Sequence, residues 1–335
     1  MLRKTKLSIL IMVLLIGCYQ NNEPNEVITE SEEYTDIGFS GISFANEMVG
    51  YISTGCNISL NIAGILKTTD GGVTWQFYPV CIDTIPSTTI RSVYALSVDT
   101  VYATYSGFSN QEDYQGVCKS VNGGVTWTNL GNLISAGAYG SVYFRNSQIG
   151  FVCNGNEILK TEDGGNNWET KFDISGFGGI GQLNFTSRDI GYACQGFVDD
   201  YGSSGKLIKT TNGGDSWSEL PSLKEYITCL KFVNNETGYA FSYNDNLYKT
   251  TNGGQSWAIH SKLPGGLYYS AVVIGSSQYF TAMNRIYRST NDFINFNEIY
   301  SSKISNVEFS GETAHPSQNT SFFLTQHSIV KIIQH

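Results

Sequence analysis

The sequence predicts an all-β fold, a β-propeller of seven four-stranded blades that strands from both chain ends close into a ring. A nine-residue phrase ending in an aromatic residue recurs at intervals of 52, 41, 49, 40 and 39 residues. Repeats of about 40 to 50 residues with strand-like content are typical of propeller blades. The composition agrees, because the 335 residues include 36 glycines and 13% aromatics but only 15% charged residues. That mixture is typical of folded β proteins with many tight turns.

Each copy of the phrase predicts a tight hairpin between the third and fourth strands of a blade. The phrase reads Lys/Arg-x-x-Asp/Asn-Gly-Gly-x-x-Trp, as in Lys67 to Trp75, and a degenerate sixth copy without the glycines ends at Phe296. Asp and Asn side chains bond to nearby backbone and tolerate positive φ, while a Gly-Gly pair adopts angles that other residues disfavour. We therefore expect a structural role, turns and inter-blade packing, for Asp70, Trp75, Asn122, Trp127, Asp163, Trp168, Asn212, Trp217, Asn252 and Trp257.

A second phrase precedes most hairpins and predicts the first two strands of a blade. Segments 42–53, 141–153, 183–194 and 230–241 show alternating apolar residues, a polar turn, then Gly-Tyr or Gly-Phe and another apolar run, which indicates two paired strands. The expected blades are 41–80, 89–130, 138–173, 180–220, 226–262 and 267–301. The closing blade is expected to contain three strand-like runs from the tail, at 304–310, 321–326 and 328–334, and a fourth strand around Tyr34–Phe39. Joining both chain ends in one blade removes exposed sheet edges. Six blades with an appended tail is the alternative.

The first 36 residues predict an export signal and a tether. A basic start is followed by an apolar run of 11 residues, Leu7 to Gly17, which is too short to span a bilayer but suits a signal peptide. The run ends in Leu-Ile-Gly-Cys, which resembles the bacterial lipobox, so Cys18 is expected to carry the lipid. The expected domains are a signal peptide at 1–17, an acidic tether at 18–36 and the propeller at 37–335. An ordinary secretory signal is the alternative.

The charge balance excludes nucleic acid as a partner. Removal of the leader leaves 20 − 3 = 17 basic residues against 29 acidic ones, a formal charge of −12, which repels phosphate backbones. Neither residue 19 nor residue 20 is Asp, the inner-membrane retention signal of the lipoproteins that the leader resembles. That resemblance implies an exported protein at the outer membrane or cell surface of a bacterium, with the membrane as a partner through the N-terminal lipid.

The hairpins resemble the Asp-box, or BNR, repeats of sialidases, sortilin-type sorting receptors and xyloglucanase-type glycosidases. The paired Gly-Tyr and Lys-Thr-Thr-Asp-Gly-Gly-x-Thr-Trp phrases are most similar to the photosystem II assembly and stability factor propellers. The resemblance covers about residues 40–300. It implies the propeller fold and little about activity, because such repeats are shared between different functions.

The sequence contains no convincing motif for catalysis, metal binding or cofactor binding. Sialidases hold a carboxylate with three arginines, and at most Arg91 and Arg285 are placed to line a pocket here. The four histidines lack metal-ligand spacing, and the one Gly-x-Gly-x-x-Gly match, Gly176 to Gly181, precedes a strand rather than a helix. We expect no metal and no cofactor. Among the cysteines, Cys56 and Cys81 are the best candidates for a disulfide, and the others are expected to be small core residues or inter-blade links.

The variable loops opposite the hairpins are the expected binding face, because variable loops on a rigid scaffold commonly bind ligands. Two aromatic, acidic loops, at 105–115 and 197–204, flank a shorter one. Their candidate ligand-binding residues are Tyr105, Phe108, Asp113, Tyr114, Phe197, Asp199, Asp200 and Tyr201. Aromatic rings there would stack on sugars or grip a peptide. The sequence therefore favours a non-enzymatic protein- or glycan-binding or assembly module in the envelope. A glycoside hydrolase or lyase using Asp113 with Asp199 or Asp200 is the alternative.

Overall fold

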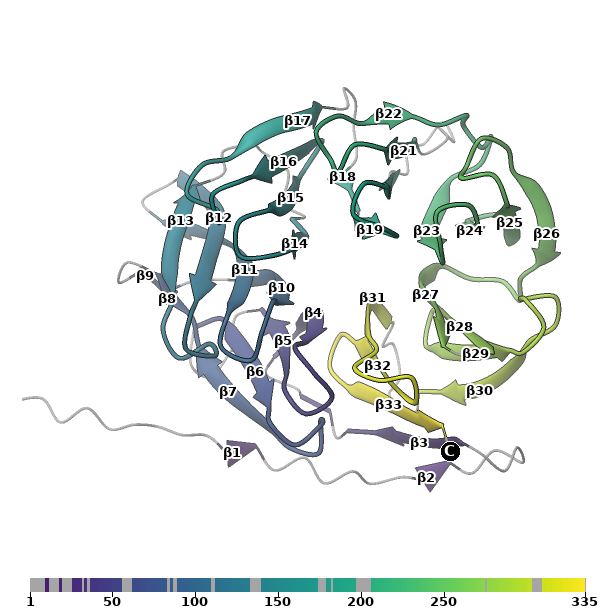
Figure 1. Cartoon of the computed structure of the whole chain (residues 1–335). Helices are drawn as coiled ribbons and strands as arrows, with labels where there is room; N and C mark the ends of the chain where they lie inside the picture. Colours follow the sequence, from purple (N-terminus) through teal and green to yellow (C-terminus); the bar gives the residue numbers. More distant parts are fainter. Residues whose placement is uncertain are drawn as a thin grey trace, which may run out of the picture.

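The structure is a computed structural model. It describes residues 10–11, 18–19, 26–31, 33–34, 37–55, 62–82, 85–86, 89–109, 112–132, 140–173, 179–181, 183–196, 206–274, 276–302 and 309–334. The described residues form seven antiparallel sheets around one axis, each sheet being a blade (Figure 1). Within this part of the chain, no helix is long and apolar enough to cross a membrane. The seven-bladed prediction is confirmed, and the six-bladed alternative is wrong.

In blades 1 to 6 the strands run outward from the ring axis in chain order. Blade 1 is formed by β4 (Phe39–Phe44), β5 (Gly50–Thr54), β6 (Gly64–Thr68) and β7 (Trp75–Pro79). Blade 2 is formed by β10 (Thr89–Ala95), β11 (Val101–Ser109), β12 (Glu112–Ser120) and β13 (Thr128–Asn132). Blade 3 is formed by β14 (Val142–Phe144), β15 (Gly150–Asn154), β16 (Glu157–Thr161) and β17 (Glu169–Asp173). Blade 4 has a divided inner strand, and it comprises β18 (Gly179–Ile180), β19 (Asn184–Phe185), β20 (Gly191–Gly196), β21 (Leu207–Thr210) and β22 (Ser218–Glu219).

The remaining blades complete the ring. Blades 5 and 6 are formed by β23 (Ile227–Phe232), β24 (Gly238–Ser242), β25 (Asn246–Thr250) and β26 (Ala258–Lys262), and by β27 (Tyr268–Ile274), β28 (Ser277–Ala282), β29 (Arg285–Ser289) and β30 (Asn297–Ser301). Blade 7 is formed by β31 (Phe309–Ala314), β32 (Thr320–Thr325), β33 (Ile329–Gln334) and β3 (Glu26–Glu30). The short strand β1 (Leu10–Ile11) pairs with β7, and β2 (Cys18–Tyr19) pairs with β3. The short strands β8 (Cys81–Ile82) and β9 (Ile85–Pro86) pair with each other.

Both chain ends meet in blade 7, but the N-terminal strand lies earlier than expected. The strand is Glu26–Glu30 rather than Tyr34–Phe39, and it pairs antiparallel with β33 along its whole length (Figure 1). Glu26 is buried there because the Arg288 side chain in blade 6 forms a salt bridge with it at 3.1 Å and the Tyr279 hydroxyl donates to it. Part of the segment expected to be a tether is therefore an outer strand. The first tail strand also differs, since β31 begins at Phe309 and residues 303–308 lie outside the described residues.

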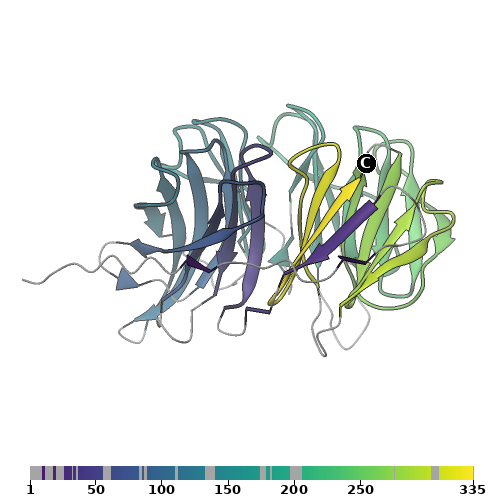
Figure 2. The ribbon, with the colours of Figure 1, turned by 90° about the horizontal axis from the view of Figure 1, so that it is seen from below.

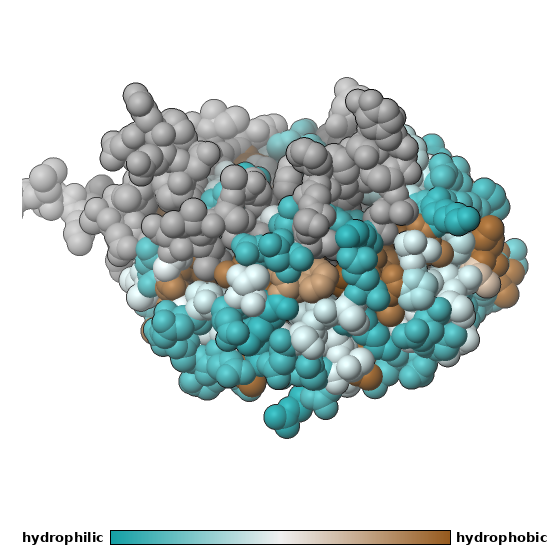
Figure 3. All heavy atoms as spheres, turned by 90° about the horizontal axis from the view of Figure 1, so that it is seen from above, coloured by the Kyte–Doolittle hydropathy of each residue, from teal (hydrophilic) through white to brown (hydrophobic). Residues whose placement is uncertain are grey.

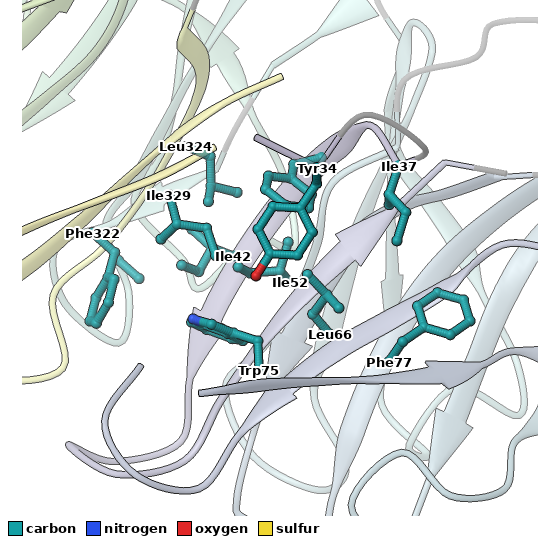
Figure 4. Close-up of a cluster of buried hydrophobic side chains, with 12 residues drawn as sticks. Tyr34, Ile37, Ile42, Ile52, Leu66, Trp75, Phe77, Phe322, Leu324 and Ile329 are labelled. Atoms are coloured by element: carbon teal, nitrogen blue, oxygen red, sulfur yellow. The ribbon is translucent and has the colours of Figure 1, made fainter. Parts of the chain in front are cut away.

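The core is divided among the junctions between neighbouring blades. Within the described residues, one buried apolar cluster lies at each of the seven junctions. Figure 4 shows the cluster between blades 7 and 1, where the Trp75 ring lies edge-on to Phe322 at 6.4 Å. Trp127, Trp168, Trp217 and Trp257 occupy the same place in their own junctions, and Phe296 does so in blade 6. The tryptophans therefore fill equivalent positions between blades.

The two faces of the ring carry different connections. The turns between first and second strands lie beside the Trp-ended hairpins, because the first hairpin glycine of five blades donates its N–H to a carbonyl of the adjacent turn, as Gly71 does to Met48 at 2.9 Å. We call this the turn face, and the opposite one, with the other connections, the loop face; Figure 2 shows the ring edge-on between the two. The outer rim in Figure 3 is mostly hydrophilic, with apolar side chains mainly in a band at mid-height.

Candidate functional site

The polar residues of the hairpins are occupied by their own turns. The Asp70 carboxylate accepts the backbone N–H groups of Val73 and Thr74 at 3.0 and 2.9 Å and the Thr74 hydroxyl at 2.6 Å. Asp163 is bonded in the same way by Asn167, and these hydrogen bonds lower the pKa of Asp163 to about 2. Both hairpin glycines have positive φ in five copies. These side chains therefore build the turn and have little capacity left for a ligand.

The recurring tyrosine and lysine of several blades join their blade to the next one. The Tyr51 hydroxyl donates to the carbonyl of Val98 at 2.7 Å, and the Lys67 ammonium donates to the carbonyl of Gly123 at 2.9 Å. Equivalent contacts join blade 4 to blade 5 and blade 7 to blade 1. The Nζ atoms of these lysines also lie over the aromatic ring of the Gly-Tyr phrase or its equivalent, 5.1 to 5.5 Å from the ring centroid. The tyrosine and the lysine of the phrases therefore also make inter-blade contacts, a role of these two residues that the sequence alone did not reveal.

The junction of blades 5 and 6 replaces one of these contacts with an ion pair. In the degenerate hairpin Asp292 stands where other copies have the first glycine, at φ 63°. Its carboxylate binds the Lys249 ammonium at 2.5 Å and the Tyr239 hydroxyl, and its backbone carbonyl contacts His260 Nε2 at 2.6 Å. Burial would raise the pKa of Asp292, but hydrogen bonds from Lys249 and Tyr239 lower it below 3.8. The cluster resembles a catalytic arrangement but serves to hold two blades together.

Acid is expected to weaken this junction. Because the pKa of Asp292 is lowered in the folded protein, its carboxylate stabilises the fold at neutral pH, and that contribution is lost as the pH falls below about 4 through the folded pKa. Urea unfolding at pH 7, 4 and 3 should therefore show a smaller loss of stability on acidification for Asp292→Asn than for wild type. Asn suits the test because it tolerates positive φ. Parallel losses in the two proteins would contradict the assignment.

The candidate residues chosen from the sequence are only partly described. Tyr105 is buried, with 3% of its area exposed, and its hydroxyl donates to Asn129 at 3.0 Å. It therefore belongs to the core rather than to an exposed binding surface, because it lies on the face of β11 that packs against blade 1. The segment 105–115, expected to be a loop, continues strands β11 and β12, with Phe108 paired to Asp113. The side chains of Phe108, Asp113 and Tyr114, and residues Phe197, Asp199, Asp200 and Tyr201, lie outside the described residues.

The cysteines and histidines give no catalytic or metal site in the part of the chain that the structure describes. Cys81 is an exposed free thiol, and its expected partner Cys56 lies outside the described residues. Burial raises the pKa of Cys153 and Cys229 to about 12 and that of Cys194 to about 11, so these thiols are protonated and poorly nucleophilic. No group of three or more metal-ligating side chains is found among the described residues.

The loop face at blade 5 carries an aromatic pair, in which Tyr243 is exposed and Tyr226 is half-buried. Tyr243, in the connection between β24 and β25, has 55% of its area exposed. Its ring lies 6.3 Å from that of Tyr226, which precedes β23, and its backbone N–H donates to the Tyr226 carbonyl at 2.9 Å. Met283, in the equivalent connection of blade 6, is 47% exposed. Exposed tyrosines that are fixed by backbone contacts suit stacking against a sugar ring or an apolar side chain.

Two carboxylates adjoin this pair, and both are held by hydrogen bonds. Glu225 accepts the Asn246 amide at 2.7 Å and the Tyr248 hydroxyl at 2.8 Å, and Asp245 accepts the Tyr268 hydroxyl at 2.8 Å. Burial would raise the pKa of Glu225, but hydrogen bonds, with that of Ser242 the largest, lower it below 4.5. A glycosidase acid needs a raised pKa to deliver a proton near neutral pH. Glu225 therefore suits acceptance of hydrogen bonds rather than acid catalysis.

Comparisons with known proteins agree with this architecture. No family model and no curated protein matches the chain. Among solved structures, YCF48 bound to a D1 peptide superposes with a TM-score of 0.73 at 14% identity, covering 92% of this chain and 97% of that one. YCF48 from Cyanidioschyzon merolae gives 0.68 at 14% identity, covering 91% and 98%. The chain is a seven-bladed β-propeller similar in fold to YCF48. The likeness expected from the repeats is thus confirmed at the level of fold.

Enzymes of the GH74 class share the architecture less closely. An ancestral GH74 enzyme superposes with a TM-score of 0.54 at 20% identity, covering 70% of this chain but 34% of that one. The Niastella koreensis GH74 enzyme gives 0.53 at 13% identity, covering 93% and 69%. At these identities the likeness shows the fold alone, and it is compatible with binding and with catalysis.

Proposed function

We propose that this chain is a lipid-anchored propeller of the bacterial cell envelope that acts as a non-enzymatic module for binding a protein or a glycan. Its contact surface is the loop face at blade 5, and the observation that carries this assignment is the exposed ring of Tyr243, fixed against the half-buried ring of Tyr226 beside the hydrogen-bonded Glu225. The fold likeness to YCF48, one structure of which holds a D1 peptide, supports a binding role. The lipobox-like sequence before Cys18 supports the anchor at the outer membrane or cell surface.

The lowered pKa of Glu225 argues against a role for this residue as the general acid of a glycosidase. The GH74 likeness keeps a glycoside hydrolase as the second candidate, and it would need a carboxylic acid and a second carboxylate across a cleft. Asp113 with Asp199 or Asp200 stays the pair predicted from the sequence. A reducing-end assay on any glycan that binds separates the two functions, because a binding module leaves the glycan intact.

Replacement of Tyr243 by alanine is expected to weaken ligand binding about tenfold, because truncation of a central aromatic contact commonly costs 1 to 2 kcal/mol or more. Binding is measured with the full chain on a glycan array and on a library of immobilised peptides. The control is Ile259→Ala, which removes another exposed apolar side chain, 61% exposed, from β26 on the outer rim of the same blade. Equal binding profiles for the two variants would refute this surface. Fatty-acid labelling that persists in a Cys18→Ser variant would refute the anchor.

A further inference from the structure

Apolar side chains gather on the turn face at blades 1 and 2. Among the described residues, seven of the ten large apolar side chains that are exposed lie in turns of this face, and five of the seven belong to these two blades. They are between 38% and 67% exposed. We call them the apolar patch, and its members are Met48, Val73, Val98, Val121 and Val125. A single exposed apolar residue is ordinary, but a group on one surface commonly marks a contact with another molecule.

The turns that carry the patch are bound to one another. In blade 1 the hairpin is joined to the neighbouring turn by the hydrogen bond from Gly71 to Met48, and in blade 2 the Gly123 N–H donates to the Asp99 carbonyl at 2.9 Å. Between the blades, the Lys67 ammonium donates to the Gly123 carbonyl at 2.9 Å. The four turns therefore form one surface with a fixed backbone.

The other copies of the hairpin show that the fold does not require valine in it. Val73 and Val125 follow the Gly-Gly pair, at a position that is exposed in all five copies with both glycines. The three remaining copies have polar residues there, Asn166, Asp215 and Gln255. Val121 precedes Asn122, where the other copies have threonine or glutamate. The second glycine of all five hairpins nevertheless donates to the same Ser or Thr hydroxyl, at 2.8 to 3.0 Å. The turn therefore forms equally well with polar residues.

The same comparison holds for Met48 in the adjacent turn. Its carbonyl accepts the N–H of the first hairpin glycine, and in four other blades the residue in this place is polar. These equivalent residues are Asp99, Gln148, Asp189 and Glu236. Apolar surface stabilises a protein only when it is removed from water. The patch is therefore suited to burial against another molecule.

The charges beside the patch are negative. The four turns comprise residues 45–49, 68–75, 97–100 and 120–127. They contain three acidic residues and no basic one, and two of the acids, Glu47 and Asp99, are exposed. The lysines of the adjoining blade junctions are half-buried, with their ammonium groups bound to hairpin carbonyls or lying over an aromatic ring. A partner therefore meets apolar side chains and carboxylates first.

We propose that the apolar patch is a docking surface for a polypeptide segment that carries aliphatic side chains together with lysine or arginine. The aliphatic side chains pack on the valines, and the basic ones face Glu47 and Asp99. A sugar is disfavoured, because no member of the patch offers an aromatic ring face. An isologous contact with a second copy would bring the acidic residues of both copies together, and an anionic lipid surface would repel them. The patch lies on the face opposite Tyr243, so it is a second site beyond the proposed function.

The test is fluorescence anisotropy with the full chain at pH 7 and three fluorescein-labelled peptides. The probes are Leu-Lys-Val-Lys-Leu-Lys amide, the same peptide with Glu in place of Lys, and the same peptide with Ser in place of Leu and Val. We expect wild type to bind only the first peptide, and more weakly as the salt concentration rises. The triple variant Val73→Gln, Val121→Thr, Val125→Gln copies the polar residues of blade 5 and keeps the net charge. It should weaken this binding at least tenfold.

Two further variants separate the apolar and the charged contributions. Ile294→Gln removes an exposed side chain from the same hairpin position in blade 6, outside the patch, and should bind as wild type. Glu47→Gln combined with Asp99→Asn should weaken binding about threefold and reduce its dependence on salt.

Several results would overturn this docking surface. These are no binding of the lysine peptide by wild type, equal binding of the glutamate peptide, or wild-type affinity in the triple variant. A wild-type dimer in sedimentation, or flotation of wild type with vesicles of phosphatidylcholine and phosphatidylglycerol, would also do so if the triple variant loses it. Melting followed by circular dichroism establishes that the variants are folded, and if the triple variant is not, Val125→Gln alone decides. Tyr243→Ala should leave these titrations unchanged, so the failure of this surface and the failure of the proposed function are distinguishable.

Discussion

Replacing Ile28 by alanine is expected to lower the free energy of unfolding by about 2 to 5 kcal/mol, the usual range for removing a buried aliphatic side chain. Ile28 is 1% exposed, pairs with Ile332 and packs in the junction between blades 6 and 7. It lies on the single N-terminal strand that completes blade 7. The cost should lie toward the upper end of the range, because Ile28 packs between two blades and loss of this strand also exposes the edge of β33.

Thr29→Ala is the matched control for this strand. Thr29 pairs with Lys331 on the same strand, is partly exposed, and is absent from the buried cluster that holds Ile28. Its replacement should cost about 0.5 kcal/mol or less, as surface substitutions usually do. Urea unfolding followed by tryptophan fluorescence measures both, since tryptophans lie in five blades. Equal midpoints for the two variants would show that closure by β3 contributes little.

Replacing Gly72 by alanine is expected to cost about 2 to 5 kcal/mol. Its φ of 80° is unfavourable for a residue with a Cβ by about 1 to 2 kcal/mol. A Cβ there would lie 2.6 Å from the ring of Phe322, and overpacking of a filled core costs about a further 1 to 3 kcal/mol. Phe322 cannot retreat, because it is fully buried and stacked on Phe44 at 4.7 Å.

Gly71→Ala separates the two contributions. Gly71 has a similar φ of 69°, but the nearest atom to its added Cβ is the Glu47 carbonyl oxygen at 3.2 Å. We expect only the backbone cost, about 1 to 2 kcal/mol. The difference between the two variants in chemical unfolding therefore measures the clash with the neighbouring blade. The packing explanation fails if both substitutions lower the unfolding midpoint equally.

The repeats made most of the fold predictable, and the closing strand was the principal exception. The turn residues and the regularly spaced tryptophans predicted blades whose bounds are close to the observed ones. The segment Glu26–Glu30 looked like a solvated tether because two of its five residues are acidic. Its burial depends on Arg288, a residue of blade 6 far along the chain. Local composition carries no information about such a distant partner.

The candidate sites were less predictable because they are assembled from segments that look ordinary in the sequence. Tyr226 and Tyr243 lie in different connections of blade 5, and only the folded sheet brings their rings to 6.3 Å.

The pairing of β3 with β33 also constrains when the protein can fold. Glu26 and Gln334 are in contact although they are 308 positions apart in the chain, and bringing such distant segments together has a large entropic cost that slows folding. The chain contains β33 after every other described strand, so the chain cannot pair β3 with β33 until the rest of the ring has been made. Until then it presents unpaired strand edges, and it would benefit from a chaperone that covers them.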